Sequence, residues 1–208
     1  MGKGKFIVVE GIDASGKGTI AMLMVGYLSE KIPREKIVVT FEPTQGKYGT
    51  EIRKILKEEK DPKKNAERCL RLYVKDREEH VKNVILPALK EGKIVICDRY
   101  KYSTIAYQSA QGVPMKKIIK MHEGMPVPDL TIILDISPEV AIKRIIEDKN
   151  RKEFDKFEKM EFLALVREKF LLMPELFPNE NIKIVDATAP AEITFSKIVK
   201  EIDKVVFG

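Results

Sequence analysis

A glycine-rich run near the N-terminus is the strongest chemical signal in this sequence. It comprises Gly11, Ile12, Asp13, Ala14, Ser15, Gly16, Lys17, Gly18 and Thr19. The run follows an apolar stretch and opens a helical pattern, which is the strand–loop–helix context of a P-loop. Glycines allow successive N–H groups to converge on phosphate oxygens, and the helix adds its positive end. We therefore predict a nucleotide-phosphate site in which Lys17 reaches the β- and γ-phosphates; a glycine-rich turn beside a surface lysine is the alternative.

A second group of polar residues follows another apolar run, at 94–97. Asp98 and Arg99 leave this predicted strand at its carboxyl end, where open α/β sheets place their ligands. Arg99 can hold an acceptor phosphate with two parallel hydrogen bonds, and Asp98 can hold a magnesium-bound water or orient the acceptor. Ser103 and Tyr107 are one helical turn apart, so they share a helix face.

Arg77 lies on an apolar helical stripe, four residues after Tyr73 and four before Val81. A guanidinium on a stripe that faces the core needs a partner. Either an internal ion pair or a bound ligand would supply one, and the residues alone leave both alternatives open.

The elements that must position these residues are short β-rich runs that alternate with helical patterns. The runs cover residues 6–10, 37–40, 94–97, 130–134 and 182–185. They predict an α/β fold with a five-stranded parallel sheet flanked by helices. Continuous apolar runs also predict strands covered on both faces. Among the helices, Ser137 and Pro138 mark one start, and residues 66–89 predict a long helix kinked at Pro87.

Length and composition restrict the class of protein. The 208 residues fit one domain, and the 44% hydrophobic and 34% charged content argues against a disordered or membrane chain. No signal peptide or spanning segment is evident, so we expect a cytoplasmic location without a membrane partner. The net charge of +6 comes from basic residues interleaved with acidic ones, so we expect no nucleic-acid partner. Cys69 and Cys97 lie in apolar segments and are predicted core residues.

The run from Asp98 to Gln108 resembles the Asp-Arg-Tyr…Ser…Ala-Tyr-Gln signature of thymidylate kinases. The resemblance extends over nearly the whole chain, from the P-loop to a basic segment near Arg151. It implies a single P-loop kinase domain over 1–208, of the nucleotide-kinase type. It also implies transfer of the γ-phosphoryl group of ATP to dTMP, which gives dTDP and ADP for dTTP biosynthesis. Mg²⁺ as cofactor and a homodimer are carried over from the family in the same way.

The resemblance assigns a role to each matching residue. The dTMP site would contain Asp13, Glu42, Pro43, Arg53, Tyr73, Arg77, Arg99, Ser103, Tyr107 and Gln108. In this family Tyr73 would stack on thymine, Arg77 would hydrogen-bond the base, and Tyr107 would crowd the 2′ position of the sugar. One position departs from the usual P-loop, in a form that nucleotide kinases resembling adenylate kinase share, and another departs from the family pattern. Gly18 follows the P-loop lysine where Ser or Thr is usual, so Thr19 and Asp98 would hold the metal through water; Phe41 replaces an arginine.

The P-loop has no arginine at Ala14 or Ser15. Family members of this kind take a catalytic arginine from a lid, which we place at about 148–156. Arg151 is the candidate, with Lys149 and Lys152 in reserve. The predicted catalytic groups are therefore Lys17, Asp98, Arg99 and Arg151.

Other functions stay open at this point. A different nucleoside monophosphate or a deoxynucleoside could be the acceptor, although Tyr73, Arg77 and the 98–108 run favour dTMP. A GTP-dependent switch would need a guanine-reading Asn-Lys-x-Asp element, which the sequence lacks. A nucleic-acid-binding protein would gather its basic residues on one face.

Overall fold

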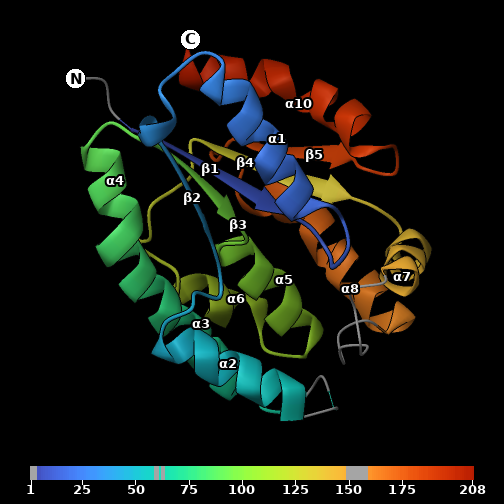
Figure 1. The fold of residues 1–208 in the computed structure, drawn as a ribbon. Coiled ribbons are helices and arrows are strands. Elements are labelled where there is room, and N and C mark those ends of the chain that lie inside the picture. The colour runs from blue at the N-terminus through green and yellow to red at the C-terminus, as the bar shows by residue number, and fades with distance from the viewer. Residues whose placement is uncertain (1–3, 59–60, 62–63, 149–158) are drawn as a thin grey trace.

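Five parallel strands form one sheet in the order β2-β3-β1-β4-β5 (Figure 1). The computed structural model describes residues 4–58, 61, 64–148 and 159–208. The strands are β1 (Lys5–Glu10), β2 (Ile37–Phe41), β3 (Ile94–Asp98), β4 (Leu130–Asp135) and β5 (Ile182–Asp186). Each lies within one residue of its predicted limits, so the apolar runs located all five, and the predicted fold class is confirmed.

Helices cover both faces of the sheet. In Figure 1, α1 (Lys17–Ser29) and α10 (Ala191–Val206) lie together on one face. The other face carries α3 (Ala66–His80), the π-helical segment η2 (Val81–Ile85), α4 (Leu86–Lys90), α5 (Lys101–Ala110) and α8 (Met160–Leu171). The remaining elements are the 3₁₀ turn η1 (Arg34–Lys36), α2 (Lys47–Glu58), α6 (Met115–Lys120), α7 (Pro138–Glu147) and α9 (Met173–Leu176).

The strands differ in how completely they are covered. The central strands β1, β3 and β4 are buried along nearly their whole length, as the apolar runs predict. The expectation of two covered faces is wrong for the edge strands β2 and β5, in which several residues are exposed. An edge strand has a neighbour on one side only, so its outward residues reach solvent.

The long helix predicted at 66–89 runs as α3, η2 and α4 in succession. Its irregularity is the π segment Val81–Ile85, which ends two residues before Pro87, where a kink was predicted. Proline lacks an N–H, and its ring clashes with the carbonyl four residues earlier, so the wider turn precedes it. The predicted start of α7 is confirmed, because the Ser137 hydroxyl accepts the Val140 N–H at 3.4 Å.

Several other predictions concern single segments. Cys69 and Cys97 are buried and free, as expected of core residues. No helix among the described residues combines the length and apolarity needed to cross a membrane. The lid candidates Lys149, Arg151 and Lys152 lie outside the described residues, as does most of the segment 148–156.

Candidate active site

The P-loop connects β1 to α1. Gly11 has φ +139°, and a Cβ there would lie 2.6 Å from the Leu134 carbonyl oxygen, so no larger residue fits. Gly16 precedes α1 with φ +94°, and no side chain caps the helix at this position. The N–H groups of the first turn of α1 can therefore meet phosphate oxygens, as the sequence predicted.

Lys17 is buried and turned back onto the loop. Its Nζ donates to the carbonyl oxygens of Gly11 at 3.1 Å and Ile12 at 2.7 Å. Burial, aided by the nearby Arg99 charge, lowers the pKa of Lys17 to about 8. A triphosphate would give this ammonium a far better anionic partner than neutral carbonyl oxygens do.

Arg99 gathers the polar groups that the sequence placed on three separate segments. Its guanidinium contacts Asp13 of the P-loop at 2.5 Å and the Ser103 hydroxyl at 3.1 Å. Tyr107, one turn after Ser103 on α5, donates its hydroxyl to Asp13 at 2.8 Å. Arg99 itself has φ +68°, a strained conformation for a residue with a side chain. The predicted cluster of Asp13, Arg99, Ser103 and Tyr107 is therefore assembled in the structure.

Glu10 supports this cluster through hydrogen bonds, and its role was not predicted from the sequence. The fully buried carboxylate accepts N–H groups from Tyr100 at 2.7 Å and Ser103 at 3.1 Å, together with the Ser103 hydroxyl. It thereby fixes the start of α5. Burial raises the pKa of Glu10 to about 7. The available signal was an acid at the end of an otherwise apolar strand.

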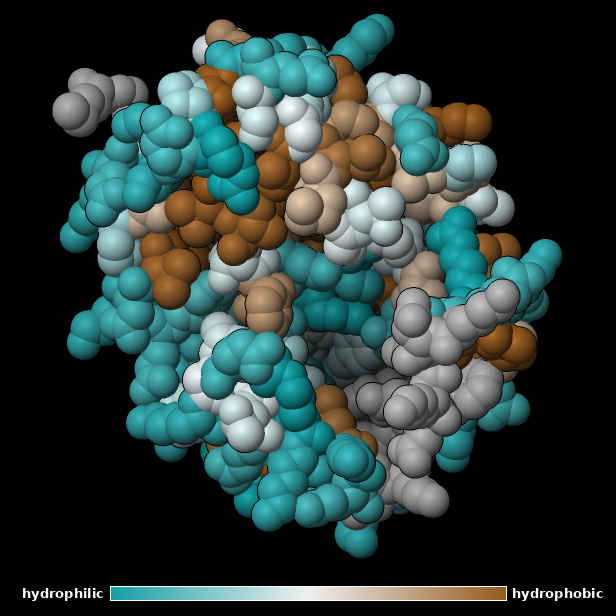
Figure 2. All heavy atoms as spheres, in the orientation of Figure 1, coloured by the Kyte–Doolittle hydropathy of each residue, from teal (hydrophilic) through white to brown (hydrophobic). Residues whose placement is uncertain are grey.

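A cavity beside the P-loop contains most of the predicted dTMP residues. The space between its lining residues, including the part open to solvent, is about 590 Å³. Nine of the ten predicted residues line it, and Arg53 is the exception. Arg53 donates instead to backbone carbonyl oxygens of Pro43 and Thr44. Figure 2 shows a hollow with hydrophilic lining in the middle of this face.

Arg77 makes an internal ion pair, the first of the two alternatives that the sequence left open. Its Nε donates to Glu42 at 2.7 Å, an ion pair in which both side chains are buried. The same guanidinium contacts His122 and donates to the Thr104 hydroxyl at 3.0 Å. Arg77 also lines the cavity, together with Tyr73 and Gln108. An internally paired arginine therefore remains available to a ligand.

Comparison with known proteins identifies the family. A family model described as thymidylate kinase matches residues 9–198. The chain belongs to the thymidylate kinase family. A probable thymidylate kinase from Pyrococcus horikoshii is 40% identical over 99% of each chain. A thymidylate kinase from Desulfotalea psychrophila is 40% identical over 78% of each chain. The crystal structure of thymidylate kinase from Ehrlichia chaffeensis superposes with a TM-score of 0.77 at 27% identity, over 97% of this chain and all of that one.

Membership of the thymidylate kinase family makes this chain a nucleoside monophosphate kinase and confirms the predicted enzyme class. Kinases of this class act on magnesium nucleotides. Asp98 fits a hydrated metal ion, because its Oδ1 is buried and lacks a hydrogen-bond partner among the described residues. Asp98 and Thr19 line the same phosphate-side cavity as Lys17. An orphaned carboxylate oxygen at this place can accept from metal-bound water.

A further hollow adjoins the P-loop, and the resemblance to thymidylate kinases assigned no ligand to it. Its lining includes Gly16, Thr19, Arg144 and Pro190. Arg144 of α7 donates to the carbonyl oxygens of Ala14 at 3.2 Å and of Ala187 at 2.9 Å. Arg144 thus ties the P-loop to the loop after β5. Its place in the sequence, on an ordinary charged helix face, did not distinguish it from a surface residue.

Proposed function

We propose that this protein is a thymidylate kinase that converts dTMP and ATP to dTDP and ADP, a step toward dTTP. The observation that carries the proposal is the shared position of Arg99. It borders both the cavity beside Tyr73 and Arg77 and the phosphate-side cavity beside Lys17. A group at the junction of two polyanion sites can bring a donor and an acceptor phosphate together.

The donor and acceptor groups in the cavity match a 4-keto pyrimidine. Arg77 offers N–H donors, which suit the O4 oxygen of thymine. The Gln108 Oε1 is buried without a hydrogen-bond partner in the described part of the chain, and it suits the N3–H donor of thymine. Cytosine reverses both groups, so it would leave a buried donor and a buried acceptor unpaired. Tyr73 would stack on the base, and Tyr107 would crowd the 2′ position of the sugar.

Phosphate binding would redistribute the charges now paired within the protein. Arg99 would hold the acceptor phosphate and Asp13 the 3′-hydroxyl, in place of their present contact. Lys17 would leave its carbonyl partners and accompany the transferring phosphoryl group. Arg53, beside the backbone of Pro43 and Thr44, would support the acceptor loop. These residues act by positioning and by stabilising negative charge, which is most of the catalysis in phosphoryl transfer.

Magnesium would be held through water by Asp98 and Thr19. When bound, the ion supplies positive charge to the β- and γ-phosphates of ATP. The adenine ring would lie in the hollow beside Arg144, next to the P-loop residues that carry the phosphates. Arg151 as lid arginine, the homodimer and the cytoplasmic location are further parts of the proposal that rest on the resemblance.

A coupled assay of ADP release tests the function directly. The protein is mixed with Mg-ATP and, in turn, each nucleoside monophosphate and each deoxynucleoside. We expect release to be fastest with dTMP and slow with thymidine, dCMP and the ribose analogue of dTMP. If ADP release stays at the background rate with every acceptor, and the protein binds oligonucleotides in a salt-dependent way, the kinase function is refuted and the nucleic-acid-binding alternative is favoured.

A further inference from the structure

Arg77 is held on three sides by protein groups. A guanidinium has five N–H groups in one plane. Three of them meet Glu42, Thr104 and His122, which leaves two without a protein partner in the described chain. The side chain is 1% exposed, so the cavity is the place where those two groups can find an acceptor. The orientation of the guanidinium plane therefore decides where the two remaining N–H groups point.

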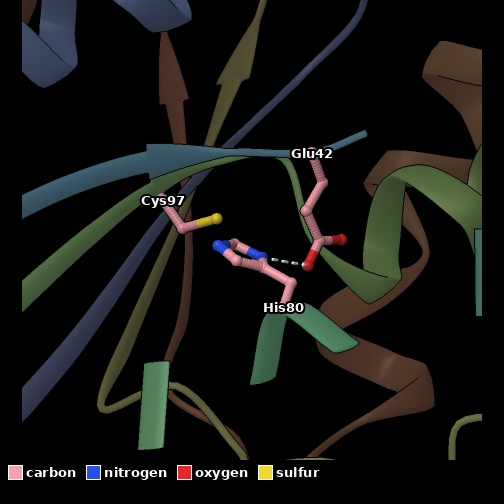
Figure 3. A group of neighbouring side chains, drawn as sticks. All are labelled: Glu42, His80 and Cys97. Atoms are coloured by element: carbon pink, nitrogen blue, oxygen red, sulfur yellow. Dashed lines mark hydrogen bonds and ion pairs between the residues drawn. The ribbon is translucent and has the colours of Figure 1, made fainter. Parts of the chain in front are cut away.

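Glu42 is itself held by a second layer of side chains. Its Oε2 accepts from Arg77, and its Oε1 accepts from His80 Nδ1 at 2.9 Å (Figure 3). A carboxylate can only accept, so the His80 proton lies on Nδ1. In the neutral ring, Nε2 then accepts from the Thr40 hydroxyl at 2.7 Å. A chain of hydrogen bonds thus connects Thr40 on β2 with Arg77 on α3.

The same side chains invite comparison with a metal site, because ligand atoms of Glu42, His80 and Cys97 lie within 4.8 Å of one another. Both carboxylate oxygens and both ring nitrogens already have protein partners. The Arg77 cation pairs with the same carboxylate, and burial raises the pKa of the Cys97 thiol well above its usual value. Among the described residues the cluster is a filled hydrogen-bond network.

His122 completes the support from the opposite side. Its Nδ1 donates to the Ile118 carbonyl oxygen at 2.7 Å, which leaves the Nε2 lone pair for Arg77. Burial, followed by the Arg77 charge, lowers the pKa of His122 to about 3. The ring therefore stays neutral and acts as an acceptor. Neutral His122 on one side and the Glu42 carboxylate on the other hold the guanidinium in one orientation.

We propose that Thr40, His80 and His122 are positioning residues, which fix the plane of Arg77 and thereby set the discrimination between 4-keto and 4-amino acceptor bases. The proposal rests on the proposed function, because it concerns the same acceptor site. None of the three is among the residues that the family resemblance assigned to dTMP. Their effect reaches the base through Arg77, since all three act on its guanidinium directly or through Glu42.

A matched pair of variants at His122 tests the proposal. His122→Leu keeps an apolar body and removes the acceptor, whereas His122→Gln can return an acceptor oxygen close to the Nε2 position. We measure kcat and KM with dTMP and with dCMP, and KM for ATP. In His122→Leu we expect the dTMP/dCMP ratio of kcat/KM to fall about tenfold or more, the order expected when a polar reading group is misplaced. KM for ATP should stay unchanged, and His122→Gln should recover most of the ratio.

Thr40→Val provides a second test should His122→Leu fail to fold. It removes one hydroxyl at the far end of the chain, and we expect a fall in the same ratio that is smaller than in His122→Leu. An unchanged ratio in folded His122→Leu or Thr40→Val overturns the proposal, and so does an equal loss for both acceptors with a lower melting temperature. The proposed function fails separately, if the unmodified protein does not phosphorylate dTMP.

Discussion

The Asp13–Arg99 contact shows how a ligand-free site can keep strong charges close together. Each side chain is partly buried, with 24% and 20% exposure. Unpaired charges in such surroundings are costly, so the contact holds both groups ready until phosphate and sugar take their places. Lys17 is also a buried charge that awaits phosphate, because its carbonyl partners compensate only weakly for its burial.

Lys17→Met should lower turnover by at least ~10²-fold, the order expected when one transition-state charge partner is lost. Methionine is unbranched and only one atom shorter than lysine, so the P-loop should fold unchanged. The assay is steady-state ADP release, with circular dichroism and dTMP binding as controls for folding. Near-normal turnover in a folded variant would refute the role of Lys17.

Glu10 predicts a pH dependence of stability. Its pKa is about 7 in the folded protein, against an ordinary value of 4.5. The folded state therefore favours the protonated acid, and this contribution is full below pH 4.5 and is lost as the pH rises through 7. One pKa unit corresponds to about 1.4 kcal/mol, so the loss is at most on the order of 3 kcal/mol.

The variant Glu10→Gln tests this pH dependence, because glutamine has no proton that titrates in this range. The free energy of unfolding of the unmodified protein, minus that of Glu10→Gln, should fall between pH 4.5 and 7. Urea titrations at a series of pH values measure it, with exposed Glu35→Gln as control. A flat difference curve would contradict the assignment of this titration to Glu10.

At the scale of elements, α3 organises the acceptor site. Asp76, Arg77 and His80 come from its last turns and are all buried. Asp76 accepts the Thr44 N–H at 2.7 Å, the Thr44 hydroxyl at 2.6 Å and the Gly49 N–H at 3.1 Å. It thereby attaches the loop after β2 and the start of α2 to α3, while the other two residues support the base-reading guanidinium.

Asp76→Asn should lower the free energy of unfolding by about 1–3 kcal/mol, because a buried donor loses a charged acceptor. KM for dTMP should rise, since the Pro43–Thr44 loop borders its cavity. Urea unfolding and steady-state kinetics measure the two effects. The control is Glu79→Gln on the same helix, whose side chain is 47% exposed in a surface pair with Lys47. Equal stability of the two variants would show that the Asp76 contacts contribute little.

The elements were predictable to different degrees from the sequence. Apolar runs located all five strands, and Ser137 with Pro138 located the start of α7. The π segment could not be predicted, because one wider turn hardly changes the helical spacing of apolar residues. His80 and His122 could not be assigned either, since their partners Glu42 and Arg77 are set by tertiary packing. The exposure of β2 and β5 depends on strand order, which no run of residues encodes locally.

At the scale of the whole molecule, one surface remains apolar. Met22 of α1, Val39 of β2 and Val84 of η2 are 63%, 39% and 37% exposed. Figure 2 shows a broad hydrophobic area on the upper part of this face, where Figure 1 places β2 and α1. An exposed edge strand beside apolar side chains is an association site that proteins rarely leave open. We propose that a second copy of the chain covers this surface in the homodimer.

Light scattering after size exclusion should therefore give twice the mass of one chain. Val39→Lys should shift the mass toward one chain, because a buried unpaired ammonium would oppose association. Ile146→Lys on α7 is the control, since Ile146 is 65% exposed on another part of the surface. A single-chain mass for the unmodified protein at micromolar concentration would exclude the dimer.

The pairing of β1 with β3 has an evolutionary consequence. The P-loop follows β1, Asp98 ends β3 and Arg99 follows it, and the two strands are neighbours with Val9 opposite Asp98. Adjacent strands lie about 4.8 Å apart, so the separation of the two phosphate-handling segments is inherited with the backbone. The base-reading groups come from α3, α5 and the loop after β2, outside that strand pair. Substitutions on these elements can therefore change the acceptor base during evolution. The distance over which the phosphoryl group moves stays the same, because it is set by the β1–β3 strand pair.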